Sequence, residues 1–341
     1  MNQFHCCLWE ATIKAVCSRS VCHYKRFLAS FSASINRLVL VGCEYGDVYD
    51  SKYKVSGKLG FGTTSTMWLA RNLREHVHVA LKQGKPFTSR LTPCRHVRTP
   101  LDTFILKYPS RNHRSLVQKP MWDSWRALLY HNPSNRSTEP LLKADLKHIL
   151  LTLDYLHTEC KLVHTDIKAD NILQEIVDES MIDVFTNEEM EAPSTRKIMD
   201  ETPIYMTRRF QLPNIFGGVV LSDFASAATE WSYQFNIWNV GAMIWELWQG
   251  YSTRAHLADV IGLLGPPPVD VFQSGLRSRE FFTERKAEVP IPQGTCLGQS
   301  KEYLEGENKN TFLAFVGSML QWGPKDRQST KQLLQDPGSI A

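Results

Sequence analysis

A carboxylate, an ammonium and an amide lie within six consecutive residues of this sequence. They are Asp166, Lys168 and Asn171 in "KLVHTDIKADNIL", residues 161–173, which follows a run with helical periodicity and precedes a short apolar run. A carboxylate accepts hydrogen bonds, an ammonium balances negative charge and an amide both donates and accepts, so three such side chains close together can form a site. The alternative interpretation of this segment is a turn whose charges are incidental. The helical run before it and the apolar run after it argue against that interpretation.

A glycine-containing turn and a lysine precede this segment. "KLGFGTTSTMWLA" places Gly60 and Gly62 between two strand-like segments, with Ser65 where a third glycine could stand. Such glycines also occur in hairpin turns that bind no ligand. One strand later, the alternation of "VHVALK" places Ala80 and Lys82 on the same face. Phosphate suits this arrangement, because backbone N–H groups approach it where side chains are absent and an ammonium balances its charge. An exposed strand lysine is the alternative for Lys82.

The remaining periodicities predict an α+β fold with two lobes. Residues 53–81 alternate as strands separated by glycines and a charged turn, which predicts a small antiparallel sheet. Residues 141–157 have helical periodicity, and residues 236–250 are apolar nearly all round, which is typical of a buried helix. The apolar face expected in the first of these helices consists of Leu142, Leu146, Ile149, Leu150, Leu153 and Leu156.

Composition is ordinary for a globular protein of 341 residues, with 43% hydrophobic and 22% charged residues. The net charge of +4 is small and scattered, so nothing favours direct nucleic-acid binding. Eight cysteines include no C-x-x-C pair, which argues against a zinc site and favours reduced thiols in an intracellular protein. No apolar run is long enough to span a membrane.

The N-terminal segment differs in composition from the rest. Residues 1–40 contain five lysines and arginines against one acid, Glu10, and are rich in serine near their end. This composition fits a mitochondrial transit segment, and a disordered leader without an address is the alternative. Residues 1–45 are therefore expected to lie outside the fold.

Four motifs resemble those of protein kinases and occur in the same order. They are "KLGFGTTSTMWLARN…VALK", "LVHTDIKADNIL", "LSDF" and "DRQST". Their wording resembles the SR-protein kinase (CMGC-like) group, particularly its fungal serine/threonine kinases, and the similarity runs from about residue 46 to 337. The resemblance implies a bilobal kinase fold. A small β-rich lobe is expected at 46–118 and a helical lobe at 119–341, with an acidic insertion at about 174–215.

The resemblance also implies a role for each site residue. Asp166 would be the catalytic base, Lys168 would contact the γ-phosphate, and Lys82 would bind the α- and β-phosphates. Asn171 and Asp223 would be the magnesium ligands. The residues expected to cover the phosphates or line the adenine are Gly60, Gly62, Ser65, Met67 and Ala80.

ATP and Mg²⁺ are the cofactors that the resemblance implies, with a protein substrate of the Arg/Ser-rich type in the cytoplasm or nucleus. Thr165 stands where most kinases have an arginine that reads a phosphorylated loop, so control by loop phosphorylation is not expected. The acidic insertion could attract Arg-rich substrates or be a solvated loop. Nothing in the sequence indicates an oligomeric state.

The first departure from the family concerns the small-lobe helix. Active kinases pair the equivalent of Lys82 with a glutamate from that helix. Between Lys82 and Glu139 there is no glutamate, and the only acids are Asp102 and Asp123. Residues 83–104 contain prolines and little apolar periodicity, so they are not expected to form the helix.

The second departure is a shortened activation segment. Twelve residues separate Asp223 from Asn236, and no A-P-E-like anchor is visible among them. Ala225 replaces a glycine, and Asn236 stands where the family has an aspartate that ties down the catalytic loop. Arg327 resembles the partner of the missing anchor glutamate, so we expect it to be either solvated or unsatisfied.

Two hypotheses follow. The first is an ATP- and Mg²⁺-dependent serine/threonine protein kinase of the SR-protein-kinase-like type, since all five of the charged or amide site residues are present. The second is a catalytically silent pseudokinase or truncated scaffold that still binds ATP, since the glutamate and most of the activation segment are missing. The missing segments fit either a natural pseudokinase or an incomplete coding sequence.

Overall fold

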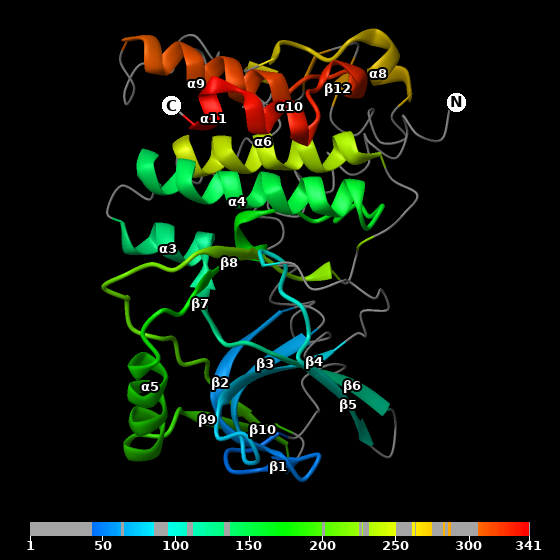
Figure 1. Cartoon of the computed structure of the whole chain (residues 1–341). Coiled ribbons are helices and arrows are strands. Elements are labelled where there is room, and N and C mark those ends of the chain that lie inside the picture. The colour runs from blue at the N-terminus through cyan, green and yellow to red at the C-terminus, as the bar shows by residue number, and fades with distance from the viewer. Residues whose placement is uncertain are drawn as a thin grey trace. The chain divides into compact units, whose positions relative to one another are not determined.

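The computed structural model describes most of the chain beyond residue 42, in two compact units (Figure 1). We refer to residues within 43–127 and 172–224 as the sheet unit, and to residues within 128–171 and 227–340 as the helical unit. The described residues are 43–62, 65–84, 95–107, 112–132, 137–199, 202–224, 227, 232–249, 261–262, 264–274, 282–283, 286–287 and 306–340. The leader predicted at 1–45 lies almost wholly outside them.

The sheet unit is built on a six-stranded antiparallel sheet with the order β1-β2-β3-β4-β6-β5. This confirms the small antiparallel sheet that the sequence predicts. Its strands are β1 (Val48–Tyr49), β2 (Tyr53–Phe61), β3 (Ser65–Asn72), β4 (His78–Gly84), β5 (Asp102–Lys107) and β6 (Asn112–Gln118).

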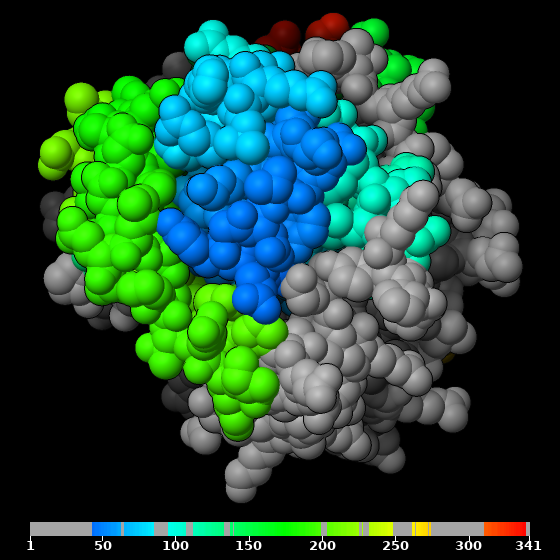
Figure 2. All heavy atoms as spheres, turned by 90° about the horizontal axis from the view of Figure 1, so that it is seen from below, coloured from blue at the N-terminus to red at the C-terminus, as the bar shows by residue number. Residues whose placement is uncertain are grey.

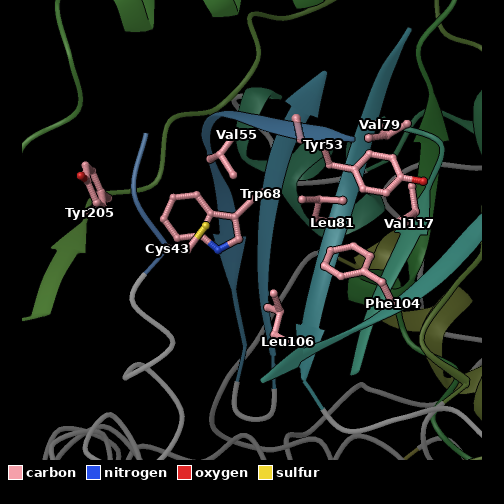
Figure 3. Close-up of a cluster of buried hydrophobic side chains, with 11 residues drawn as sticks. Cys43, Tyr53, Val55, Trp68, Val79, Leu81, Phe104, Leu106, Val117 and Tyr205 are labelled. Atoms are coloured by element: carbon pink, nitrogen blue, oxygen red, sulfur yellow. The ribbon is translucent and has the colours of Figure 1, made fainter. Parts of the chain in front are cut away.

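One face of this sheet carries the core of the unit (Figure 3). Trp68, Leu81 and Val117 come from three neighbouring strands and are buried there. The alternation along β4 therefore sends Ala80 and Lys82 to the opposite face, as expected. The buried cluster consists of Cys43, Tyr53, Val55, Trp68, Ala70, Val79, Leu81, Phe104, Leu106, Val117 and Tyr205.

A second sheet in this unit has the order β11-β8-β7, formed by β7 (Met121–Ser124), β8 (Ile172–Glu175) and β11 (Val219–Leu221). The chain between β8 and β11 forms α5 (Ser180–Glu191), β9 (Arg196–Met199) and β10 (Thr202–Tyr205). The described part of the acidic insertion predicted at 174–215 thus belongs to the sheet unit. The predicted lobe boundary at 118/119 stays a prediction.

The insertion packs closely on β2. Gly57 lies against Phe185 of α5, and a Cβ atom built at Gly57 would be 2.8 Å from Phe185 Cε1. In Figure 2 the green atoms of the insertion flank the blue atoms of β1 and β2. Buried Glu189 of α5 accepts hydrogen bonds from Arg208 and from Ser194. The acidic run is therefore partly a packed helix and not only a solvated loop.

The helical unit is organised around α4 (Glu139–Thr158) and α6 (Tyr233–Gln249). All six apolar residues expected on one face of α4 are at most 1% exposed, and most of the described apolar side chains of α6 are buried. α4 contacts α6, α10 and α11, while α9 contacts α6 and α11. The further helices with described bounds are α3 (Trp125–His131), η1 (Ala169–Asn171), α8 (Val269–Ser274), α9 (Gly306–Met319), η5 (Pro324–Asp326), α10 (Thr330–Gln335) and α11 (Pro337–Ile340). Of these, α3 begins in the sheet unit. A small hairpin consists of β12 (Phe282–Thr283) and β13 (Lys286–Ala287).

Two further expectations concern helices. In the described stretch between β4 and β5, residues 95–101, there is no helix, while residues 85–94 lie outside the described part of the chain. None of the described helices has the length and hydrophobicity needed to cross a bilayer.

The contact between Gly57 and Phe185 can be tested by overpacking. Gly57→Ala should lower the free energy of unfolding by about 1–3 kcal/mol, because the new methyl group must displace the Phe185 ring. Gly60→Ala is the matched control in the same strand, where a Cβ would meet nothing within 4 Å. Urea unfolding of the two variants measures the difference, and equal stabilities would contradict the close packing of α5 on β2.

Candidate active site

The loop after α4 brings Asp166, Lys168 and Asn171 together in the helical unit. Lys168 Nζ lies 2.7 Å from Asp166 Oδ2. Asn171 Nδ2 donates to the backbone oxygen of Asp166 at 2.8 Å and to its Oδ2 at 3.0 Å. The Asp166 side chain is 42% exposed and the Lys168 side chain 32% exposed, so both remain accessible to a ligand. The structure therefore groups the three residues that the sequence singled out in this segment.

The 3₁₀ turn η1 places Asn171 beside the carboxylate. The backbone N–H of Asn171 donates to Lys168 O at 2.9 Å, and Ile167 and Ala169 are buried beneath the loop. Thr165, just before Asp166, has a φ of +64°, a left-handed conformation that is uncommon for a residue with a branched Cβ. Its backbone must be held by neighbouring groups.

Asn236 of α6 provides one of these contacts. Its Oδ1 accepts a hydrogen bond from the Thr165 backbone N–H at 3.3 Å, a neutral contact at the place where the family aspartate makes a charged one. Its Nδ2 lies 3.0 Å from His157 Nε2, and the His157 ring stacks on Tyr233. Because Asn236 Oδ1 already accepts, the amide nitrogen donates and His157 Nε2 accepts, as a neutral imidazole.

His157 was not predicted from the sequence. A histidine in the last turn of a helix usually interacts with the helix carboxyl end at the surface, and no pattern distinguished this one. Here it is only 6% exposed, and burial lowers its pKa from 6.5 to about 4, against the smaller opposing effect of Asp154. The imidazole is therefore a fixed neutral support for the loop.

Arg327 corrects an expectation. We expected a solvated or unsatisfied arginine, but its residue is 8% exposed and its guanidinium donates to the backbone oxygens of Gln321, Gln234 and Trp322. The guanidinium also lies over the Trp238 ring at 4.6 Å. Burial lowers its pKa to about 9. Backbone carbonyls, and no carboxylate among the residues that the structure describes, satisfy this cation.

The glycine turn lies in the sheet unit at the end of the β2–β3 hairpin. Gly60 pairs with Met67, and the Gly62 N–H donates to Ser65 O at 2.7 Å. A Cβ at Gly60 would meet nothing within 4 Å, and one at Gly62 would only approach Ser65 O at 4.0 Å. Neither has a positive φ. The described protein atoms therefore do not explain why these positions are glycine.

Lys82 has a different partner from the one that the family resemblance implies. Its Nζ forms an ion pair with Asp223 Oδ1 at 2.8 Å, and the two side chains are 16% and 36% exposed. Asp223 has a φ of +64°, which aspartate tolerates better than most residues. Lys82 also faces Met67 in the register of β3 and β4, and buried Ala80 follows on the same face.

The two other acids that the sequence offered do not contact Lys82. Asp102 binds Lys52 Nζ at 2.9 Å and the Tyr53 hydroxyl at 2.7 Å. Asp123 Oδ2 lies 3.8 Å from Arg209 Nη1. Ala225, expected to replace a pivoting glycine, lies outside the described residues.

Protonation of His157 should make stability depend on pH. The folded state favours the neutral ring, so as pH falls below 6.5 the unfolded chain takes up a proton that the folded chain refuses until about pH 4. At 1.36 kcal/mol per unit, the difference between 6.5 and about 4 amounts to about 3 kcal/mol of lost stability. Urea unfolding between pH 7 and 4 should show this loss, and His157→Gln should remove it. Exposed His76→Gln is the control, and a slope unchanged in His157→Gln would refute the assignment.

Arg327→Lys should destabilise the helical unit although it keeps the charge. A compact ammonium cannot reach three carbonyls that a planar guanidinium bridges, so we expect a loss of about 2–4 kcal/mol. Lys325→Gln, two residues away and exposed, should change stability by less than about 0.5 kcal/mol. Equal unfolding midpoints for Arg327→Lys and the parent chain would contradict this account.

Comparison with known proteins places this sequence in a family. A family model described as protein kinase domain matches residues 103–337. A serine/threonine protein kinase of Aspergillus fumigatus is 34% identical, and the match covers 87% of this chain and 86% of the relative. The serine/threonine-protein kinase SRPK of Physarum polycephalum is 24% identical over 86% of this chain and 87% of its own length. SRSF protein kinase 3 of Homo sapiens is 30% identical over 38% of this chain and 26% of its own.

The fold agrees with these sequence matches. The crystal structure of a kinase domain superposes with a TM-score of 0.58 at 17% identity, covering 87% of this chain and 98% of that one. Members of this family generally use ATP and Mg²⁺. The chain therefore belongs to the protein kinase domain family and is related to its serine/threonine kinases of the SR-protein-kinase-like type.

Proposed function

We propose that this chain binds ATP with Mg²⁺ and transfers the γ-phosphoryl group to a serine or threonine hydroxyl of a protein substrate. The observation that carries the proposal is the cluster in which Lys168 and Asn171 both bind Asp166 Oδ2. A carboxylate held by two donors and still 42% exposed is positioned to receive a substrate hydroxyl.

Asp166 is the proposed catalytic base. Its carboxylate accepts a hydrogen bond from the substrate hydroxyl, orients the oxygen toward the γ-phosphorus and takes its proton as the oxygen attacks. The bond from the attacking oxygen to the γ-phosphorus forms while the bond to the bridging oxygen of ADP breaks. Lys168, 2.7 Å from Asp166 Oδ2, supplies an ammonium that neutralises the γ-phosphoryl oxygens.

The residues proposed for the metal fit its chemistry. Magnesium prefers oxygen ligands, and Asn171 donates to Asp166 through Nδ2, which leaves the amide oxygen as its proposed ligand atom. Asp223 supplies a carboxylate in the sheet unit. The metal would neutralise charge on the phosphates, and these two residues would hold it.

The glycine turn and its neighbours are the proposed nucleotide contacts. Gly60 and Gly62 leave space that no described protein atom fills, which supports a close approach of phosphate to the backbone of the turn that ends at Ser65. Lys82 is the proposed ligand of the α- and β-phosphates. Met67 and Ala80, on the face of β3 and β4 that carries Lys82, are proposed to line the adenine.

The proposed substrate is an Arg/Ser-rich protein, and the proposed site of action is the cytoplasm or nucleus. The support is the similarity to proteins named SRPK and SRSF protein kinase 3. The acidic insertion is in keeping with a basic substrate, because α5 carries no lysine or arginine among its twelve residues.

A catalytically silent, nucleotide-binding protein is the second candidate. The ion pair between Lys82 and Asp223 favours it, because Lys82 binds the proposed metal ligand where an active kinase would supply a glutamate. Residues 95–101 contain no helix that could present such a glutamate.

Phosphate transfer to an Arg-Ser repeat peptide, measured with the purified full chain, ATP and Mg²⁺, tests the first function. Asp166→Asn should lower the rate by about 10²–10⁴-fold, because it removes the base and keeps the shape. Glu159→Gln, an isosteric change at an exposed position in the same unit, is the control and should leave the rate within about twofold.

The same assay decides between the two candidates. Transfer by the parent chain that does not exceed that of Asp166→Asn, together with a thermal shift on adding ATP, would support the silent nucleotide-binding protein. The absence of both phosphate transfer and a thermal shift would refute both candidate functions.

A further inference from the structure

The segment after β4 runs beside the strand that leads to Asp223. Leu221 N–H donates to His96 O at 2.9 Å, and Arg98 N–H donates to Leu221 O at 2.9 Å. Val97 and Leu221 form a parallel bridge between these two bonds. These bonds fix the backbone of Arg98 next to Leu221, the last residue of β11. Leu221 precedes Asp223 by two residues.

The Arg98 side chain is buried, and not all of its N–H donors have an acceptor in the described part of the chain. The residue is 9% exposed, and its Nη2 donates to the backbone oxygen of Lys119 at 3.0 Å. Its Nε is buried and has no acceptor among the described residues. Burial lowers the pKa of Arg98 to about 10, and the charge of Asp223 acts in the opposite direction. Arg98 is therefore a cation at neutral pH, and its guanidinium has five N–H donors to satisfy.

Two cations share the field of one carboxylate at this place. Asp223 already binds Lys82 through Oδ1 and also interacts electrostatically with Arg98. The three groups together carry a charge of +1. A buried cation with an unused donor is costly unless an anion completes its surroundings. An oxyanion with several acceptor atoms, such as a phosphate, satisfies a guanidinium in its bidentate geometry.

We propose that Arg98 is an anion-binding residue which, with Lys82, binds the phosphates of a nucleoside triphosphate and makes nucleotide binding independent of Mg²⁺. This inference rests on the proposed nucleotide-binding function. It differs from that function in its residue and in its metal requirement. Lys82 and Arg98 supply two positive charges to the phosphates, whereas a metal ion at Asp223 must compete with the Lys82 ammonium that already binds the carboxylate.

The test is the affinity of the full chain for ATP, measured by calorimetry in excess EDTA and in excess Mg²⁺. The parent chain should bind ATP in EDTA with a Kd within about threefold of the Kd in Mg²⁺. Arg98→Gln should raise the Kd in EDTA about tenfold or more, because a charged hydrogen-bonding partner is lost. Arg98→Lys should have a smaller effect, since the charge stays and the fork is lost.

Two controls separate loss of phosphate contacts from loss of the fold. Arg95→Gln removes an exposed arginine three residues away and should leave the Kd unchanged. Adenosine has no phosphate, so Arg98→Gln should bind it as the parent chain does. An equal loss of ATP and adenosine binding in Arg98→Gln would show a general structural role and overturn the proposal.

The remaining outcomes distinguish this inference from the function on which it rests. ATP binding that requires Mg²⁺, or that is unaffected by Arg98→Gln, would overturn the inference and leave the nucleotide-binding function standing. Absence of ATP binding under either condition, in a chain that unfolds cooperatively, would overturn both.

Discussion

The ion pair between Lys82 and Asp223 is the interaction on which the proposed nucleotide site depends. It joins residues 141 positions apart and holds the strand β4 to the end of β11. In a kinase with the usual glutamate, lysine and aspartate have separate partners, and the aspartate is available to a metal. Here the Asp223 carboxylate forms an ion pair with Lys82 and also interacts electrostatically with Arg98. Under the functions proposed above, both catalysis and the metal requirement of nucleotide binding depend on how readily Lys82 and Asp223 separate.

In the helical unit, the described side chains that hold the Thr165 backbone are neutral. Asn236 and neutral His157 form a hydrogen-bonded chain from the buried helices to the Thr165 backbone, and Arg327 is held by carbonyl oxygens. A neutral support is weaker per bond than a charge-assisted one, but it is also independent of ionic strength. Asn236 thereby binds the left-handed residue of the loop that also contains the Asp166, Lys168 and Asn171 cluster. The loop around Thr165 is therefore still bound to α6, although Asn236 stands where the family has an aspartate.

Local periodicity allowed much of the fold to be predicted, because strand alternation and helical spacing act over a few residues. The face of Lys82, the buried stripe of α4 and the grouping of Asp166 with Asn171 followed from such patterns or from the family motifs. Long-range pairing was not predictable in this way. Nothing near Arg98 in the sequence indicates that its backbone would pair with Leu221, and a buried cation looks in sequence like any surface arginine.

The contact between α5 and β2 constrains how sequences of this kind can vary. Gly57 and Phe185 are far apart in the chain, yet the ring occupies the volume that a side chain at 57 would need. A larger residue at 57 is compatible with the same packing only beside a smaller one at 185, so the two positions should change together among relatives that keep the insertion. Glycine at position 57 is thus required by the packing of α5. Relatives that lack α5 should tolerate larger residues at this position.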